Sequence, residues 1–146
     1  MKNLIIYLTL LSAIGGAQSF ASTDVDQIDR DKEKLANAST FSLGMVGFTG
    51  HISESEKIYR KILKNREANE IFKEIIRSKE STNEAKLYAA CGLRTLSPSL
   101  FKKEASDILP NGGSASVLRA DILNKEKMTD LIESIGKNGC NQLGKQ

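Results

Sequence analysis

The sequence predicts an all-α fold, a small domain of five to six helices, on three observations. Between positions 53 and 135, apolar residues recur mostly at spacings of three and four, the period of a helix with one buried face. Serines that can cap a helix precede three of these apolar segments, at Ser53, Ser81 and Ser97. Pro98 then stands at the first expected helical position, which proline favours.

Residues 1–21 have the pattern of a cleaved secretory signal peptide. A short charged start precedes an uncharged apolar run over residues 4–14, which fits the apolar region of such a signal. The run is too short for a membrane-spanning helix, which needs about 20 residues. Small residues at Ser19 and Ala21 indicate cleavage after Ala21, with cleavage after Ala17 as the alternative.

Cleavage leaves a single α-helical domain over residues 22–146, which we expect to be exported to the periplasm or secreted. No later stretch is apolar enough to cross a bilayer, so we expect no stable membrane insertion. The whole chain carries a net charge of +3, and cleavage removes one lysine. Nucleic-acid-binding domains are usually far more basic, and only 5% of the residues are aromatic, so we expect no nucleic-acid partner.

The two cysteines, Cys91 and Cys140, are expected to form one disulfide, because export leads to an oxidising compartment. Such a bond closes a loop of about 50 residues, and chain-entropy arguments give it about 4 kcal/mol of stabilisation. A free reactive thiol is the alternative.

The chain ahead of Ser53 is less regular. Residues 26–38 predict a weak helix with acidic residues near its start. Residues 41–50 are apolar with glycines three apart, but they match neither G-x-G-x-x-G nor a loop that ends in Gly-Lys-Ser/Thr. We therefore expect a short buried segment that ends in a turn, and not a phosphate-binding loop.

The central part predicts four helices, over residues 53–64, 65–78, 81–96 and 97–109. Ser53 and Glu56 have the spacing of a capping box, in which each side chain accepts a backbone N–H of the other residue. Ser81 and Glu84 repeat this spacing, and Asn65 can cap the second helix.

Shifting the chain against itself aligns the core positions of these helices in pairs. The matches are Ile58-Tyr59 with Leu87-Tyr88 and Ile71-Phe72-Lys73 with Leu100-Phe101-Lys102. Residues 53–109 thus resemble the two-helix repeats of HEAT- and TPR-type proteins, with a shorter period and without the signature residues of those families. The resemblance implies two stacked αα-hairpins with flanking helices.

The C-terminal part is open before its last helix. Residues 114–123 fit an extended segment and a helical turn equally well. Asn124 is expected to cap a last helix that Gly136 ends. The buried face of that helix would consist of Met128, Leu131, Ile132 and Ile135.

His51 is the only histidine, so a catalytic triad or a Cys-His pair would have to use it. The sequence singles out no carboxylate partner for it. One histidine and two distant cysteines also lack the spacing of a zinc site, and no calcium-binding loop is present. We therefore predict no catalytic residue, no metal site and no cofactor.

The predicted helix over residues 53–64 carries a basic stripe on its polar face. The stripe is a candidate binding face for an acidic protein, an anionic polymer or a phospholipid head group. An ordinary solvated helix face is the alternative, since Glu54 and Glu56 lie nearby. The stripe consists of Lys57, Arg60, Lys61 and Lys64.

The function that these features favour is that of an exported, non-enzymatic helical module that binds another exported or envelope protein. Inhibitors and immunity-type proteins belong to this class. One alternative is a small hydrolase of envelope polymers that uses His51 with a carboxylate. Another is an envelope structural component held by the basic stripe.

Overall fold

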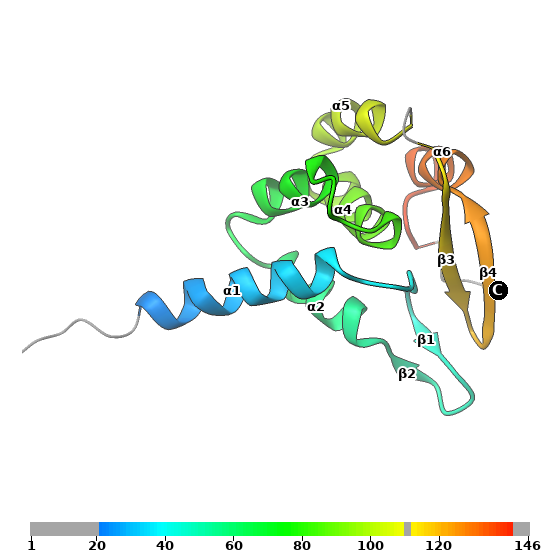
Figure 1. Ribbon diagram of the computed structural model, residues 1–146, viewed down its shortest axis with the longest axis horizontal. Helices are drawn as coiled ribbons and strands as arrows, with labels where there is room; N and C mark the ends of the chain where they lie inside the picture. The colour runs from blue at the N-terminus through cyan, green and yellow to red at the C-terminus, as the bar shows by residue number, and fades with distance from the viewer. Residues whose placement is uncertain (1–20, 110–111, 142–146) are drawn as a thin grey trace, which may run out of the picture.

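A computed structural model describes residues 21–109 and 112–141 of the chain, with side chains from residue 26 onward in those ranges. The described part holds six helices and two small antiparallel sheets of two strands each (Figure 1). The fold is therefore largely helical, as predicted, but the all-α prediction is wrong for the two sheets. Apart from Ala21, the expected signal peptide over residues 1–21 lies outside the described residues.

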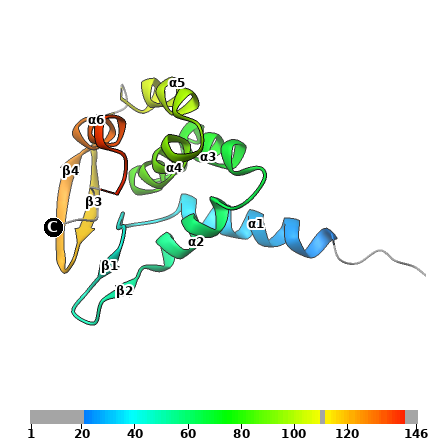
Figure 2. The same ribbon diagram turned by 180° about the vertical axis from the view of Figure 1, so that it is seen from behind.

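The central helix α4 contacts each of the other five helices and the strand β3, and the strands lie at one end of the fold (Figures 1 and 2). In chain order the elements are α1 (Ala21–Ala36), β1 (Met45–Val46), β2 (His51–Ile52), α2 (Glu54–Ile62), α3 (Ala68–Arg77), α4 (Asn83–Leu96), α5 (Pro98–Ile108), β3 (Ser114–Arg119), β4 (Ile122–Lys127) and α6 (Met128–Asn138).

Two helix starts show how local chemistry sets the boundaries. The Ser53 hydroxyl accepts the N–H of Glu56 at 3.2 Å and caps α2, as predicted. At α4 the cap is Thr82 and not Ser81, because the Thr82 hydroxyl accepts the N–H of Ala85 at 3.1 Å. The same hydroxyl donates to the carbonyl of Ala38 at 2.6 Å, so the cap also fixes the end of α1 against α4.

The helices pair differently from the predicted repeat. The helix α3 packs along α4, and α4 packs along α5, whereas α2 packs mainly against α1. The expected hairpin of α2 with α3 is therefore not formed. Tyr59 of α2 does meet Phe72 and Tyr88, with ring centroids 5.9 and 5.6 Å apart, so the aligned positions share one core. Any helices that surround one core place apolar residues at similar inward positions. The alignment of such positions therefore did not determine which helices pack against each other.

Residues 114–127 form a β-hairpin, which resolves the open prediction for residues 114–123 in favour of a strand. Ser114 pairs with Lys127 and Arg119 with Ile122 at the two ends of the register. The last helix therefore begins at Met128 and not at Asn124, which lies in β4.

That last helix keeps its predicted buried face but ends later than predicted. It passes through Gly136 and stops at Gly139, whose φ of 70° is a left-handed value that glycine tolerates. The Cys91–Cys140 disulfide follows directly and joins this end to α4, with Cα atoms 5.7 Å apart. The predicted disulfide is thus confirmed. Within the described ranges, every helix is too short or too polar to traverse a bilayer.

Residues 41–50 are buried only in part, and they end in a turn as expected. Phe41, Ser42 and Val46 are buried, but the chain beyond them turns outward at the end of the β1–β2 hairpin. Met45 and Phe48 are exposed there. Glycines at positive φ make this turn possible, among them Gly47 at φ 73°.

Candidate functional site

The most unusual surface of the described chain lies at the outer ends of the two hairpins. Four large apolar side chains are exposed there, with relative exposures of 72% for Met45, 103% for Phe48, 57% for Ile122 and 60% for Leu123. We call these four residues the hairpin-end surface. Soluble proteins expose single apolar residues freely, but grouped ones mark interaction sites.

A direct backbone contact holds the two hairpin ends together. Val46 and Ala120 form an isolated parallel bridge, and the N–H of Gly47 donates to the carbonyl of Ala120 at 2.8 Å. Figures 1 and 2 show both ends projecting from the helices on the same side. The four exposed side chains therefore belong to one region of the surface. In the sequence, Met45 and Phe48 precede Ile122 and Leu123 by more than 70 positions.

Buried polar groups fix the base of the first hairpin. The hydroxyl of Tyr88 donates to the carbonyl of Ser42 at 2.9 Å and accepts the N–H of Ser42 at 3.0 Å. The carboxylate of Glu56 accepts the N–H of Gly44 at 2.8 Å. Tyr88 and Glu56 are both fully buried, so these bonds form away from water, where an unpaired group would be costly. The hairpin is thereby anchored to α4 and α2.

The basic stripe of α2 is largely engaged in ion pairs within the molecule. Arg60 donates from two nitrogens to the buried carboxylate of Glu56, at 2.6 and 2.9 Å. Lys61 lies 2.6 Å from the Asp31 carboxylate, and the amine of Lys57 lies 3.6 Å from Glu54. Lys57, Arg60, Lys61 and Lys64 all remain exposed to solvent. The stripe stays a predicted binding face, with three of its four charges partly neutralised.

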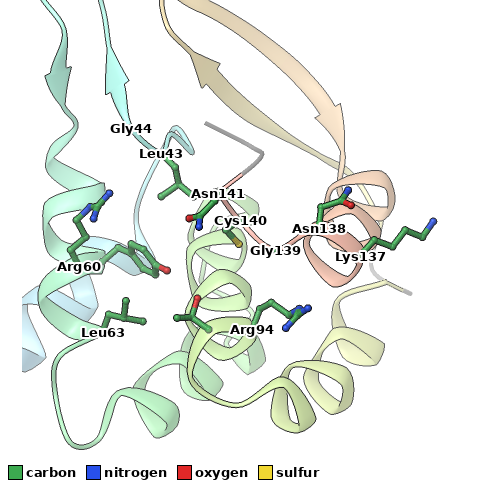
Figure 3. A pocket seen from close by; sticks show the side chains of 12 residues that line it. Leu43, Gly44, Arg60, Leu63, Arg94, Lys137, Asn138, Gly139, Cys140 and Asn141 are labelled. Carbon is green, nitrogen blue, oxygen red and sulfur yellow. The ribbon is translucent and has the colours of Figure 1, made fainter. Parts of the chain in front are cut away.

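A cavity of about 670 Å³ lies between α2, α4 and the end of α6 (Figure 3). Its lining includes Arg60, Arg94 and Lys137 and no acidic residue. Each of these cations stands in the last turn of its own helix, where it offsets the partial negative charge of the helix end. Figure 3 shows Arg60 and Lys137 on opposite sides of the cavity, so the three charges do not converge on one point.

Tyr59 forms part of the wall of this cavity. Burial raises the pKa of its hydroxyl above the ordinary value of 10.0, and a hydrogen bond with Thr95 offsets part of that rise. The hydroxyl is therefore protonated at neutral pH and acts as a structural hydrogen-bonding group, not as a base.

His51 stands apart from any catalytic arrangement. It is exposed on β2, where its ring lies beside Gly47, and it is not among the residues that line the cavity between α2, α4 and α6. No carboxylate among the described residues bonds to it. The same residues contain no group of three or more His, Cys, Asp or Glu placed to hold a metal ion.

The hairpin-end surface was missed by reasoning from the sequence. Residues 41–50 were expected to form a buried segment, and residues 114–123 were left open between an extended segment and a helical turn. The run Gly47-Phe48-Thr49-Gly50 did carry a usable signal, since two glycines around a two-residue step are typical of a tight turn. A phenylalanine at the tip of such a turn is too far from the core to be buried in it.

Comparison of the chain with protein-family models, with curated proteins and with solved structures finds no match.

Proposed function

We propose that this chain is an exported, non-enzymatic binding module that docks another protein on the hairpin-end surface. The observation that carries the proposal is the grouping of Met45, Phe48, Ile122 and Leu123 on two adjoining hairpin ends. An inhibitor or immunity-type role is one form that such docking takes.

The energy available from this surface suits a specific interaction. Burying one large apolar side chain contributes about 1.5–3 kcal/mol, so four contribute roughly 6–12 kcal/mol before the entropy of association is subtracted. The anchoring bonds of Ser42 and Gly44 hold the first hairpin in place before a partner arrives. A preformed surface loses little conformational entropy on binding, which leaves more of that energy as affinity.

A protein partner fits this surface better than a lipid bilayer does. The exposed carboxylate of Asp121 lies next to Ile122 at the tip of the second hairpin, where it would oppose insertion among anionic head groups. The first hairpin carries no lysine or arginine between residues 44 and 52. Membrane-surface segments usually flank their apolar residues with such cations, and here only the second hairpin does so, with Lys125 and Lys127 beyond Leu123.

The other two functions receive less support. A hydrolase would need a carboxylate beside His51, and none of the described ones bonds to it. An envelope component held by the basic stripe would use charges of which three already face acids of the same chain.

The proposal is tested by capturing proteins from an extract of the native source with the chain itself and with two double variants. Phe48→Ser with Ile122→Ser removes apolar area at the hairpin ends. Leu96→Ser with Leu109→Ser removes exposed apolar area elsewhere and is the matched control. We expect a protein that the unchanged chain and the control both retain and that the hairpin variant loses, at unchanged thermal stability.

Two results would overturn the proposal. One is a captured protein that both double variants retain equally. The other is sedimentation with neutral or anionic lipid vesicles that the hairpin variant abolishes, because the surface would then be a membrane anchor.

A further inference from the structure

Among the described residues, no strand pairs with the outer edge of β4. The sheet to which β4 belongs has two strands, and β3 lies on one side only. In Figure 1, β4 is the outermost element on its side of the fold. Among the described residues, nothing else pairs with it.

The register shows which backbone groups point away from β3. The N–H of Met128 bonds to the carbonyl of Gly113 at 3.0 Å, one step beyond the pair of Ser114 and Lys127. Inward bonding alternates along an antiparallel strand, so every second residue before Met128 also faces β3. The residues between them, Leu123, Lys125 and Lys127, direct their N–H and C=O groups outward. No hydrogen bond among the described residues reaches the backbone of these three.

The opposite edge of the same hairpin is covered by this chain. Phe41 donates to the carbonyl of Ser116 and accepts the N–H of Leu118, both at 2.8 Å. The N–H of Ser116 bonds to the Glu84 carboxylate at 2.7 Å, and the carbonyl of Ser114 accepts the Asn83 side chain at 3.0 Å. The edge of β3 is thus covered by other parts of the chain, whereas the edge of β4 is open among the described residues.

The side chains of the outward residues form one exposed row. Leu123, Lys125 and Lys127 alternate with their neighbours along β4, so they share one face of the hairpin, and all three are exposed. Leu123 belongs to the hairpin-end surface, and the two lysines continue the row toward α6. None of the ion pairs of the described residues involves Lys125 or Lys127.

We propose that an extended, acidic segment of the partner protein adds to β4 as a third strand of this sheet. The inference rests on the proposed function and names the chemistry of the partner. Main-chain hydrogen bonds to Leu123, Lys125 and Lys127 provide the pairing, as in other cases of strand addition. An apolar residue of the segment stands opposite Leu123, and acidic residues at alternate positions stand opposite Lys125 and Lys127.

Lysines on an edge strand also protect a protein against pairing with unsuitable strands. Here the two lysines that hinder pairing with unsuitable strands are also the groups that would recognise an acidic one. A neutral or basic strand gains the backbone bonds but leaves two lysines unpaired or repelled, whereas an acidic strand neutralises both.

The test uses a synthetic peptide with valine and two glutamates at alternate positions and threonine between them, titrated into isotope-labelled protein at millimolar concentration. We expect shifts of the amide resonances of Leu123, Lys125 and Lys127, and hydrogen exchange at these amides slowed about tenfold. Methylation of the peptide nitrogens that face β4 keeps the side chains and should abolish the slowing. A peptide with lysine in place of glutamate should not bind.

The matched variants exchange charge on β4 and elsewhere. Lys125→Glu with Lys127→Glu should reverse the preference toward the lysine peptide, whereas Lys102→Glu with Lys103→Glu, on the exposed side of α5, should leave it unchanged. Binding that survives nitrogen methylation, shifts that map away from β4, self-association through β4, or no shift at millimolar peptide would each overturn strand addition. The capture experiment with the Phe48 and Ile122 variants is independent of the peptide, so it shows whether the proposed function fails as well.

Discussion

Glu56 connects the surface to the core at the scale of a single residue. Its carboxylate is fully buried and accepts one backbone N–H, from Gly44, and two bonds from Arg60. The bond to Gly44 fixes the hairpin that carries Met45 and Phe48. Ser53 accepts the backbone N–H of Glu56, so one short segment both starts α2 and holds the hairpin.

We predict that Glu56→Ala lowers the free energy of unfolding by about 2 kcal/mol, because the partly buried N–H of Gly44 loses its acceptor and Arg60 loses its partner. Urea unfolding followed by circular dichroism measures this change. Glu54→Ala is the control on the same helix and should change stability by less than about 0.5 kcal/mol, since its ion pair with Lys57 is exposed. Equal effects of the two substitutions would contradict the account.

Because of Tyr59, the free energy of unfolding should depend on pH in the alkaline range. Burial raises the pKa of this tyrosine in the folded protein, whereas an unfolded tyrosine loses its proton near pH 10. Between these two values the unfolded state binds fewer protons, so stability should fall as pH rises above 10 and through the folded pKa. Comparing unfolding free energies of the unchanged chain and Tyr59→Phe over this range isolates the effect. A parallel decline in both proteins would refute it.

Single residues were predictable from the sequence where their bonds are local. The cap of α2 by Ser53 follows from spacing alone, and so does the position of Pro98 at the start of α5. The role of Glu56 was not predictable in full, because its acceptor bond to Gly44 depends on where the hairpin lies. The spacing of Ser81 and Glu84 predicts a cap at Ser81, whereas the cap is Thr82, whose hydroxyl also bonds to the distant carbonyl of Ala38.

At the scale of elements, α3 and α4 approach closely at a glycine. A Cβ atom on Gly92 would lie 2.2 Å from the ring of Phe72. We predict that Gly92→Ala destabilises the protein by roughly 2 kcal/mol or more, because neither the ring nor the helix can move freely in a packed core. Thermal unfolding measures the effect.

Gly136 is the matched helical glycine. A Cβ atom there would meet Phe101 at 3.4 Å, close to ordinary contact. Gly136→Ala should therefore be neutral or stabilising by up to about 1 kcal/mol, through helix propensity. A loss of stability as large as that of Gly92→Ala would show that the packing of α4 on α3 is not specifically tight.

The helices were predictable and the strands were not, for a physical reason. Amphipathic helices reveal themselves through a local period, and the buried face of α6 was correct residue by residue. The strand β3 gains its partners from Phe41 and Glu84, which lie far away in the sequence. No local pattern distinguishes such a segment from a helical turn.

At the scale of the whole molecule, the Cys91–Cys140 disulfide ties the end of α6 to the central helix. Intact mass should rise by two hydrogens on reduction, and reduction should lower the unfolding free energy by about 4 kcal/mol. An unchanged mass would refute the bond, and an unchanged stability would refute its structural role. Cys91→Ala with Cys140→Ala separates loss of the bond from effects of the reductant.

The pair of α4 with α5 followed from the order of the apolar segments, but the expected pair of α2 with α3 did not form. The α1 helix was predicted to be weak, yet it is the main packing partner of α2. Leu35 is fully buried in that contact region of the core, which its single position in a polar stretch did not reveal. The apolar hairpin ends were hidden for the same reason, since burial is a property of the whole molecule.

The central claim is that the hairpin-end surface docks a protein, and photo-crosslinking tests it most directly. A benzoyl-phenylalanine placed at position 48 should crosslink to one defined protein in an extract of the native source, and the crosslinked peptide should lie within reach of β4. The same group at position 109, on the surface near α5, should give no such product. Crosslinks of equal yield from both positions, or none from position 48 while position 109 reacts, would contradict the account.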